Sequence, residues 1–147
     1  MAERTPAQVF PRRDAQGRVI SLAELVFAAL GGAAVGLVLL AAVDGILALV
    51  GLSRFGSASG WLVAILPAFL FFDEFRAWRG NGVRILVVAV AAAVALGTGL
   101  LAAGVASAWP PLFSGALGAG VAVGVFGVVW FVGIRWLTGH RGHLESS

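Results

Sequence analysis

The sequence predicts an all-α integral membrane protein with four transmembrane helices and with both termini in the cytoplasm. Of its 147 residues, 60% are hydrophobic and 12% are charged, whereas soluble domains have about 45–50% apolar and about 25% charged residues. A soluble domain of this size buries only about two thirds of its chain surface, so it could not hide so much apolar surface. Long charge-free runs, separated by short segments that carry arginine, divide the chain into spans.

The residue types that the chain lacks argue against an enzyme and against a bound cofactor or metal. Cys, Tyr and Lys are absent, the one methionine is Met1, and the two histidines are His140 and His143. Haem requires axial His, Met or Cys ligands, and a serine hydrolase requires a base beside its nucleophile. We therefore expect no catalytic activity, no cofactor and no metal site.

The first span is expected near residues 25–50. Residues 1–20 are polar and basic and contain Pro6 and Pro11, which predicts a cytoplasmic tail without a continuous helix. Ser21 and Glu24 have the spacing of a capping box, so a helix should begin there. The apolar run from 25 to 52 is interrupted only by Asp44. A helix of this length is roughly 42 Å long, so it must tilt, bend or protrude from a hydrocarbon core of about 30 Å.

The second span is expected near residues 57–78. Residues 55–72 are an 18-residue stretch without charge, which is just long enough to cross a membrane. Pro67 within it predicts a kink. The helix should end at Gly80, Asn81 and Gly82, because glycine and asparagine tolerate the positive φ of a helix C-cap.

The third and fourth spans are expected near residues 84–107 and 113–136. Residues 85–134 are 50 consecutive residues without a charge. The sequence Trp109-Pro110-Pro111 divides this run, because proline lacks an amide donor and disfavours helix in the residue before it. The four-helix transmembrane domain then covers residues 21–137, and residues 138–147 form a cytoplasmic C-terminal tail.

Arginine placement predicts the orientation. With four spans, nine of the ten arginines lie on one side of the membrane and only Arg54 lies on the other. The positive-inside rule places the arginine-rich side, with both termini, in the cytoplasm. We expect the protein to be a multi-pass protein of a cell (inner) membrane. The chain has a net charge of +3. Because its arginines cluster beside apolar runs, this charge indicates membrane orientation and not a nucleic-acid partner.

Asp44 and Arg54 are the candidate polar site within or near the membrane. Intramembrane carboxylates are costly and often mark a proton or cation pathway. The alternative, which we favour, is an interfacial carboxylate that is wetted by headgroup water or paired with Arg54.

The hairpin between the second and third spans is the candidate surface for anionic lipid headgroups or a cytoplasmic partner. An alternative is a charged turn that only fixes topology. The residues of this candidate surface are Asp73, Glu74, Arg76, Trp78, Arg79 and Arg84.

Glycines at helical spacing are candidates for helix packing. Small residues four apart flatten a helix face and let two backbones approach closely. They can serve packing within the bundle, which we favour, or a seam with another subunit. The candidates are Gly32 and Gly36 in the first span and Gly120, Gly124 and Gly127 in the fourth.

In size and span count the chain resembles small bacterial four-helix membrane proteins such as the small multidrug resistance transporters and the GtrA-like polyprenyl-lipid proteins. The resemblance concerns architecture, because Glu24 lies at the start of the first span and not well inside it as in the small multidrug resistance family. We expect an accessory or assembly subunit of a larger membrane complex, with the lipid bilayer, other membrane subunits or copies of itself as partners. The alternative is a small homo-oligomeric transporter or channel with Asp44 on its pathway.

Overall fold

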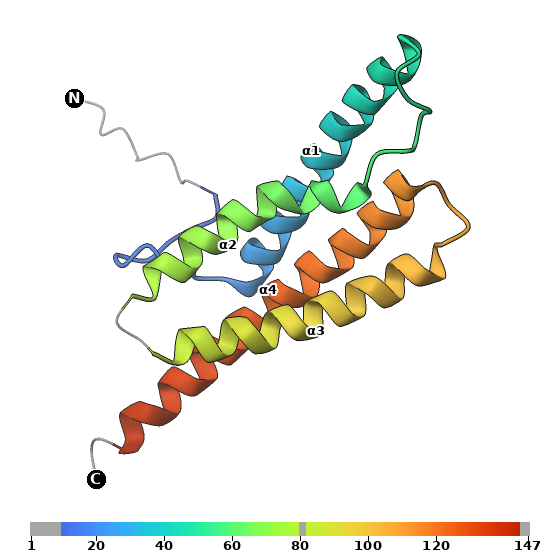
Figure 1. Cartoon of the computed structure of the whole chain (residues 1–147). Helices are drawn as coiled ribbons and strands as arrows, with labels where there is room; N and C mark the ends of the chain where they lie inside the picture. The colour runs from blue at the N-terminus through green and yellow to red at the C-terminus, as the bar shows by residue number, and fades with distance from the viewer. Residues whose placement is uncertain (1–9, 80–81, 145–147) are drawn as a thin grey trace, which may run out of the picture.

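The computed structural model describes residues 10–79 and 82–144, and it is helical throughout most of these ranges. Figure 1 shows the arrangement of α1 (Leu22–Leu49), the 3₁₀ helix η1 (Gly60–Ala64), α2 (Ile65–Ala77), α3 (Val83–Val105) and α4 (Pro111–Leu144). Three helices are long and apolar enough to cross a membrane: α1, α3 and the Pro111–Gly139 part of α4. The prediction of an all-α fold is thus confirmed, and three helices have the length and composition that a membrane span requires.

The second predicted span differs from the expectation of one long, kinked helix. The chain instead forms η1 and then α2, which together cover 18 residues. Pro67 is the third residue of α2, where a proline breaks no intrahelical hydrogen bond because the first amides of a helix have no partner. The helix changes from 3₁₀ to α two residues before Pro67, and the proline lies in the first turn of α2.

Helices α3 and α4 form an antiparallel hairpin in which two backbones touch. The break predicted at Trp109-Pro110-Pro111 is confirmed, since α3 ends at Val105 and α4 begins at Pro111. A Cβ atom added to Gly99 of α3 would lie 2.7 Å from the carbonyl oxygen of Gly118 of α4. Only glycine permits so close an approach, so this pair fixes where the two helices cross.

Residues 10–20 form a small hairpin that folds against the helices. Arg13 and Val19 form an isolated antiparallel bridge, and the turn contains Gly17 at φ +80°. Val19 is fully buried in a cluster with residues of all four α-helices. The expected tail therefore contains an ordered segment, because a single apolar residue among the arginines reaches the core.

The start of α1 differs in detail from the predicted capping box. The helix begins at Leu22 with Ser21 as its N-cap, but the Ser21 side chain makes no capping hydrogen bond. Glu24 instead accepts hydrogen bonds from the backbone amide and the Nε of Arg12, at 2.7 and 2.6 Å. The hairpin supplies a charged donor that the local sequence pattern does not reveal.

Packing is uneven along the molecule. Only 11% of the most apolar 18-residue stretch of α1 is buried inside the protein, compared with 33% for α4. The C-terminal end of α1 extends away from α3 and α4 (Figure 1). Much of the apolar surface of α1 is therefore available to lipid or to another protein.

Candidate functional site

Asp44 does not meet Arg54, its expected partner. Its carboxylate is 2% exposed and accepts a hydrogen bond of 2.5 Å from the backbone amide of Gly56, while Arg54 is exposed. Within the described ranges no ion pair joins the two residues. Gly56 has φ +86°, a conformation that glycine adopts readily. Asp44 thus fixes the loop between α1 and η1.

Glu74 is buried, although we expected it on a surface for lipids or partners. It is 1% exposed and accepts hydrogen bonds from the Val19 amide at 3.0 Å and from Trp78 Nε1 at 3.1 Å. The guanidinium of Arg13 lies 3.7 Å from its carboxylate. On the other side of Val19, Arg135 donates a hydrogen bond of 2.5 Å to the Val19 carbonyl. Glu74 and Arg135 therefore hold the 10–20 hairpin between α2 and α4.

The hairpin is also stabilised by Asp14 and Arg18. The carboxylate of Asp14 accepts hydrogen bonds from the Arg18 amide and Nε, both at 2.9 Å, and from the Gln16 amide at 3.0 Å. Desolvation acts to raise the pKa of Asp14, but these hydrogen bonds outweigh it and hold the pKa below its ordinary value. The Arg18 guanidinium meanwhile lies 4.7 Å from the ring centroid of Trp78.

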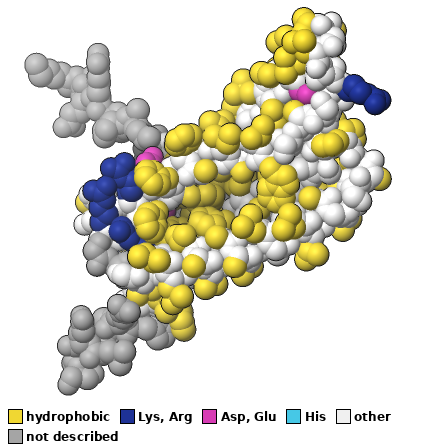
Figure 2. Space-filling model, viewed as in Figure 1, with side chains coloured by type: hydrophobic (Ala, Val, Ile, Leu, Met, Phe, Trp, Pro, Cys, Tyr) yellow, Lys and Arg dark blue, Asp and Glu magenta, His cyan; other side chains and the backbone are white. Residues whose placement is uncertain are grey.

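The remaining members of the predicted surface lie near the turn between α2 and α3. Arg76 lies over Phe72 at 5.6 Å from the ring centroid, and Arg84 lies over Phe75 at 4.5 Å. Asp73 and Arg79 are exposed, and among the described residues no ion pair joins Asp73 to Arg76. Figure 2 shows the arginine side chains gathered at this end of the molecule.

The five predicted packing glycines fall into two groups. Gly32 and Gly36 of α1 face Pro67 and Val63, with added Cβ atoms 3.5 and 3.0 Å from the nearest heavy atoms, and Gly127 faces Val26 and Phe71 at 3.5 Å. Gly120 and Gly124 have nothing within 4 Å of an added Cβ. The first group packs the bundle, and the second group has no packing contact among the residues that the structure describes.

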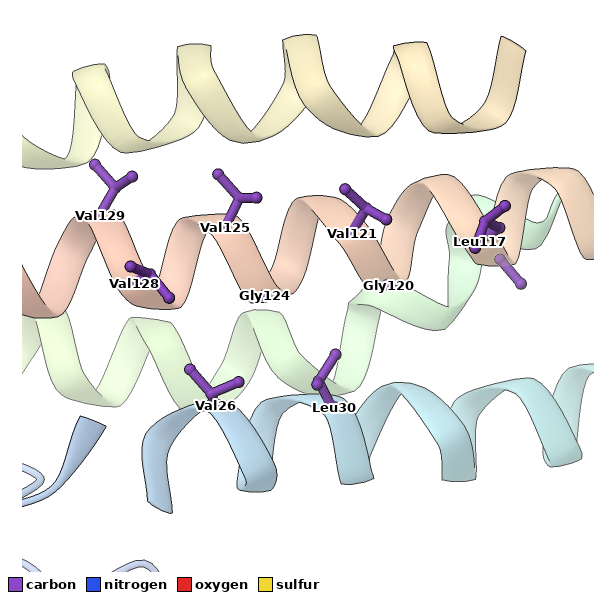
Figure 3. A pocket seen from close by; sticks show the side chains of 10 residues that line it. Val26, Leu30, Leu117, Gly120, Val121, Gly124, Val125, Val128 and Val129 are labelled. Carbon is purple, nitrogen blue, oxygen red and sulfur yellow. The ribbon is translucent and has the colours of Figure 1, made fainter. Parts of the chain in front are cut away.

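Gly120 and Gly124 lie in a shallow apolar groove between α1 and α4, which we call the α1/α4 groove. It has a volume of about 680 Å³ and follows roughly 20 Å of α4 at 1.5 Å per residue. Figure 3 shows Val26 and Leu30 pointing from α1 toward α4. Gly120 and Gly124 have no side chains, so α4 presents only backbone to the groove at these two positions. Its lining residues are Val26, Leu30, Ala116, Leu117, Gly120, Val121, Gly124, Val125, Val128 and Val129.

A second groove, the α2/α3 groove, lies between α2 and α3 and is floored by α4. It has a volume of about 520 Å³, and it is visible in Figure 2 as a hollow with hydrophobic walls beside the arginine cluster. Unlike the first groove it is rich in large aromatic side chains. Its lining residues are Trp61, Ala64, Ala68, Phe71, Phe72, Phe75, Val88, Ala92, Ala95, Leu96, Ala122, Val123 and Phe126.

The linings of both grooves are made of apolar side chains and glycine, which suits the binding of apolar partners. In the parts of the chain that are described, no group of three or more His, Cys, Asp or Glu side chains could hold a metal ion. Sequence reasoning missed both grooves and the contact between Gly99 and Gly118. No spacing in the sequence marks that contact, because it depends on where the two helices end: Gly99 lies six residues before the last residue of α3, and Gly118 lies seven after the first residue of α4.

Comparisons with family models, with curated proteins and with solved structures find no match to this chain.

Proposed function

We propose that this protein is an accessory or assembly subunit of a membrane complex and that its α1/α4 groove receives a transmembrane helix of another membrane protein. The observation that carries the proposal is the open space above Gly120 and Gly124, which no part of the described chain fills. Two glycines one turn apart let a partner backbone approach closely. Within the bilayer, such close van der Waals packing is a main source of helix association.

The proposal includes an inner-membrane location with four passes and both termini in the cytoplasm. Its second pass consists of η1 and α2, which together rise about 30 Å, at about 2.0 Å per residue in the 3₁₀ part and 1.5 Å in the α part. This rise equals the thickness of a hydrocarbon core. The arginines at the α2–α3 turn and in the 10–20 hairpin favour the cytoplasmic side for that end.

Copurification from native membranes tests the proposal. The full chain carries an affinity tag and is compared with Gly120→Leu and Gly124→Leu. A matched control is Gly97→Leu on α3, where an added Cβ also meets nothing within 4 Å but which does not line the groove. We expect the chain and the control to retain one membrane protein in fixed ratio, and the two groove variants to lose it while remaining folded.

Two results would contradict this function. One is a partner that is retained by both groove variants. The other is isolation of the chain as a homo-oligomer without any second protein, which would favour the alternative of a small oligomeric transporter or channel with Asp44 on its pathway. For that alternative, Asp44→Asn should abolish flux in liposomes without loss of folded protein.

A further inference from the structure

We infer that the α2/α3 groove binds an anionic phospholipid, with an acyl chain between α2 and α3 and the phosphate held by Arg76 and Arg84. This site is distinct from the α1/α4 groove, and the inference does not depend on the proposed partner helix. The α2/α3 groove is apolar along its length, and two guanidinium groups lie at one end of it.

The walls of the groove fit a flexible chain better than a helix. Phe71, Phe72 and Phe75 of α2 and Phe126 of α4 project into the lining, and Trp61 lies toward the opposite end. Bulky rings keep a partner backbone at a distance, whereas a helix seam needs small residues. The lining runs from Trp61 to Phe75, a rise of roughly 24 Å. This is enough for one leaflet of hydrocarbon, which is about 15 Å deep.

Arg76 and Arg84 supply the charge at the end of the groove. Each guanidinium lies over a phenylalanine that lines it, Arg76 over Phe72 and Arg84 over Phe75. Stacking uses the face of a guanidinium and leaves its N–H edge available for a phosphate oxygen. In residues 10–79 and 82–144 neither guanidinium has a carboxylate partner. The two charges and the apolar walls together match a lipid that has an anionic headgroup.

Lipid titration followed by native mass spectrometry tests the site. The full chain is purified in detergent, delipidated and titrated with phosphatidylglycerol or with phosphatidylcholine of the same acyl chains. We expect the chain to prefer phosphatidylglycerol, and each of Arg76→Gln and Arg84→Gln to weaken its binding about fivefold. The matched control Arg79→Gln removes one positive charge from the same end of the molecule. It should leave binding unchanged, because among the described residues Arg79 is not stacked on an aromatic ring of the groove.

A second pair of variants tests whether the apolar lining of the α2/α3 groove binds the acyl chain. Ala92→Phe fills the groove and should reduce binding of both lipids, while Ala93→Phe, on the next residue of α3 and outside the lining, should not. Equal binding of the two lipids by the unmodified chain would overturn the inference. So would an Arg79→Gln effect as large as that of Arg84→Gln, which would indicate a diffuse surface charge. Loss of lipid binding in Ala93→Phe as large as in Ala92→Phe would also overturn it.

Discussion

Asp44 and Glu74 are the two buried acidic residues within the described ranges, and each fixes a segment that is not helical. Asp44 accepts a hydrogen bond from the backbone amide of Gly56 in the α1–η1 loop. Glu74 accepts one from the backbone amide of Val19 in the 10–20 hairpin. A buried carboxylate is costly unless hydrogen bonds satisfy it. Each carboxylate accepts a hydrogen bond from a backbone amide, 12 positions away for Asp44 and 55 for Glu74, and a backbone amide carries no side-chain pattern. For this reason the sequence suggested an interfacial acid at Asp44, with a pathway acid as the alternative, and a surface acid at Glu74.

Glu74→Gln should destabilise the fold and loosen the 10–20 hairpin. The carboxylate accepts hydrogen bonds with both oxygens, one from Val19 and one from Trp78, and glutamine has only one acceptor oxygen. A buried donor left without a partner costs about 1–3 kcal/mol. The measurement is thermal unfolding in detergent, combined with hydrogen exchange of the Val19 amide.

Asp73→Asn is the matched control for this change. It alters the neighbouring residue, which is exposed, and should leave both unfolding and exchange unchanged. If Glu74→Gln and Asp73→Asn behave alike, the network around Val19 does not stabilise the hairpin.

At the scale of the elements, the sequence was most informative where proline and charge define the ends of a helix. The predicted span 84–107 corresponds to α3 at Val83–Val105, and the break at Pro110-Pro111 lies where it was expected. The stretch around Pro67 was harder, because a proline fits both a kink and a first turn. What decides between them is the packing of Gly36 against the Val63 backbone and of Gly60 against α4, which involves residues distant in sequence.

Gly118→Leu should destabilise the α3–α4 hairpin, whereas Gly120→Leu, two residues further on, should not. A Cβ at Gly118 would lie 2.7 Å from the Gly99 carbonyl oxygen, while one at Gly120 meets nothing within 4 Å. Overpacking of this kind costs about 1–3 kcal/mol, whereas glycine is a poor helix former and its replacement where space is open is neutral or favourable. Thermal unfolding of the two purified variants makes the comparison. Equal melting temperatures would show that the Gly99–Gly118 contact does not determine the crossing.

For the whole molecule, the apolar composition predicted a bilayer protein but not which helix faces the protein itself covers. Gly32 and Gly120 begin the same spacing motif in the sequence, yet Gly32 packs against Pro67 and Gly120 faces an open groove. The difference depends on how α1 and α4 diverge. That divergence is a property of the assembled bundle and not of either helix alone.

The two grooves give the molecule two different surfaces toward the membrane. The α1/α4 groove has a glycine floor and no charged lining residue, which suits a helix. The α2/α3 groove has aromatic walls and lies beside two stacked arginines, which suits an anionic lipid. Under the two proposals above, the protein would hold a partner helix on one side and a lipid on the other.

Photocrosslinking in native membranes tests the docking of a partner helix most directly. A photoreactive phenylalanine analogue replaces either Leu117, which lines the α1/α4 groove, or Leu100 of α3, which lines neither groove; both side chains are exposed, by 41% and 61%. We expect a covalent adduct with one distinct membrane protein from position 117 and none with any protein from position 100. Adducts with lipid alone at both positions, or an adduct between two copies of this chain, would contradict it.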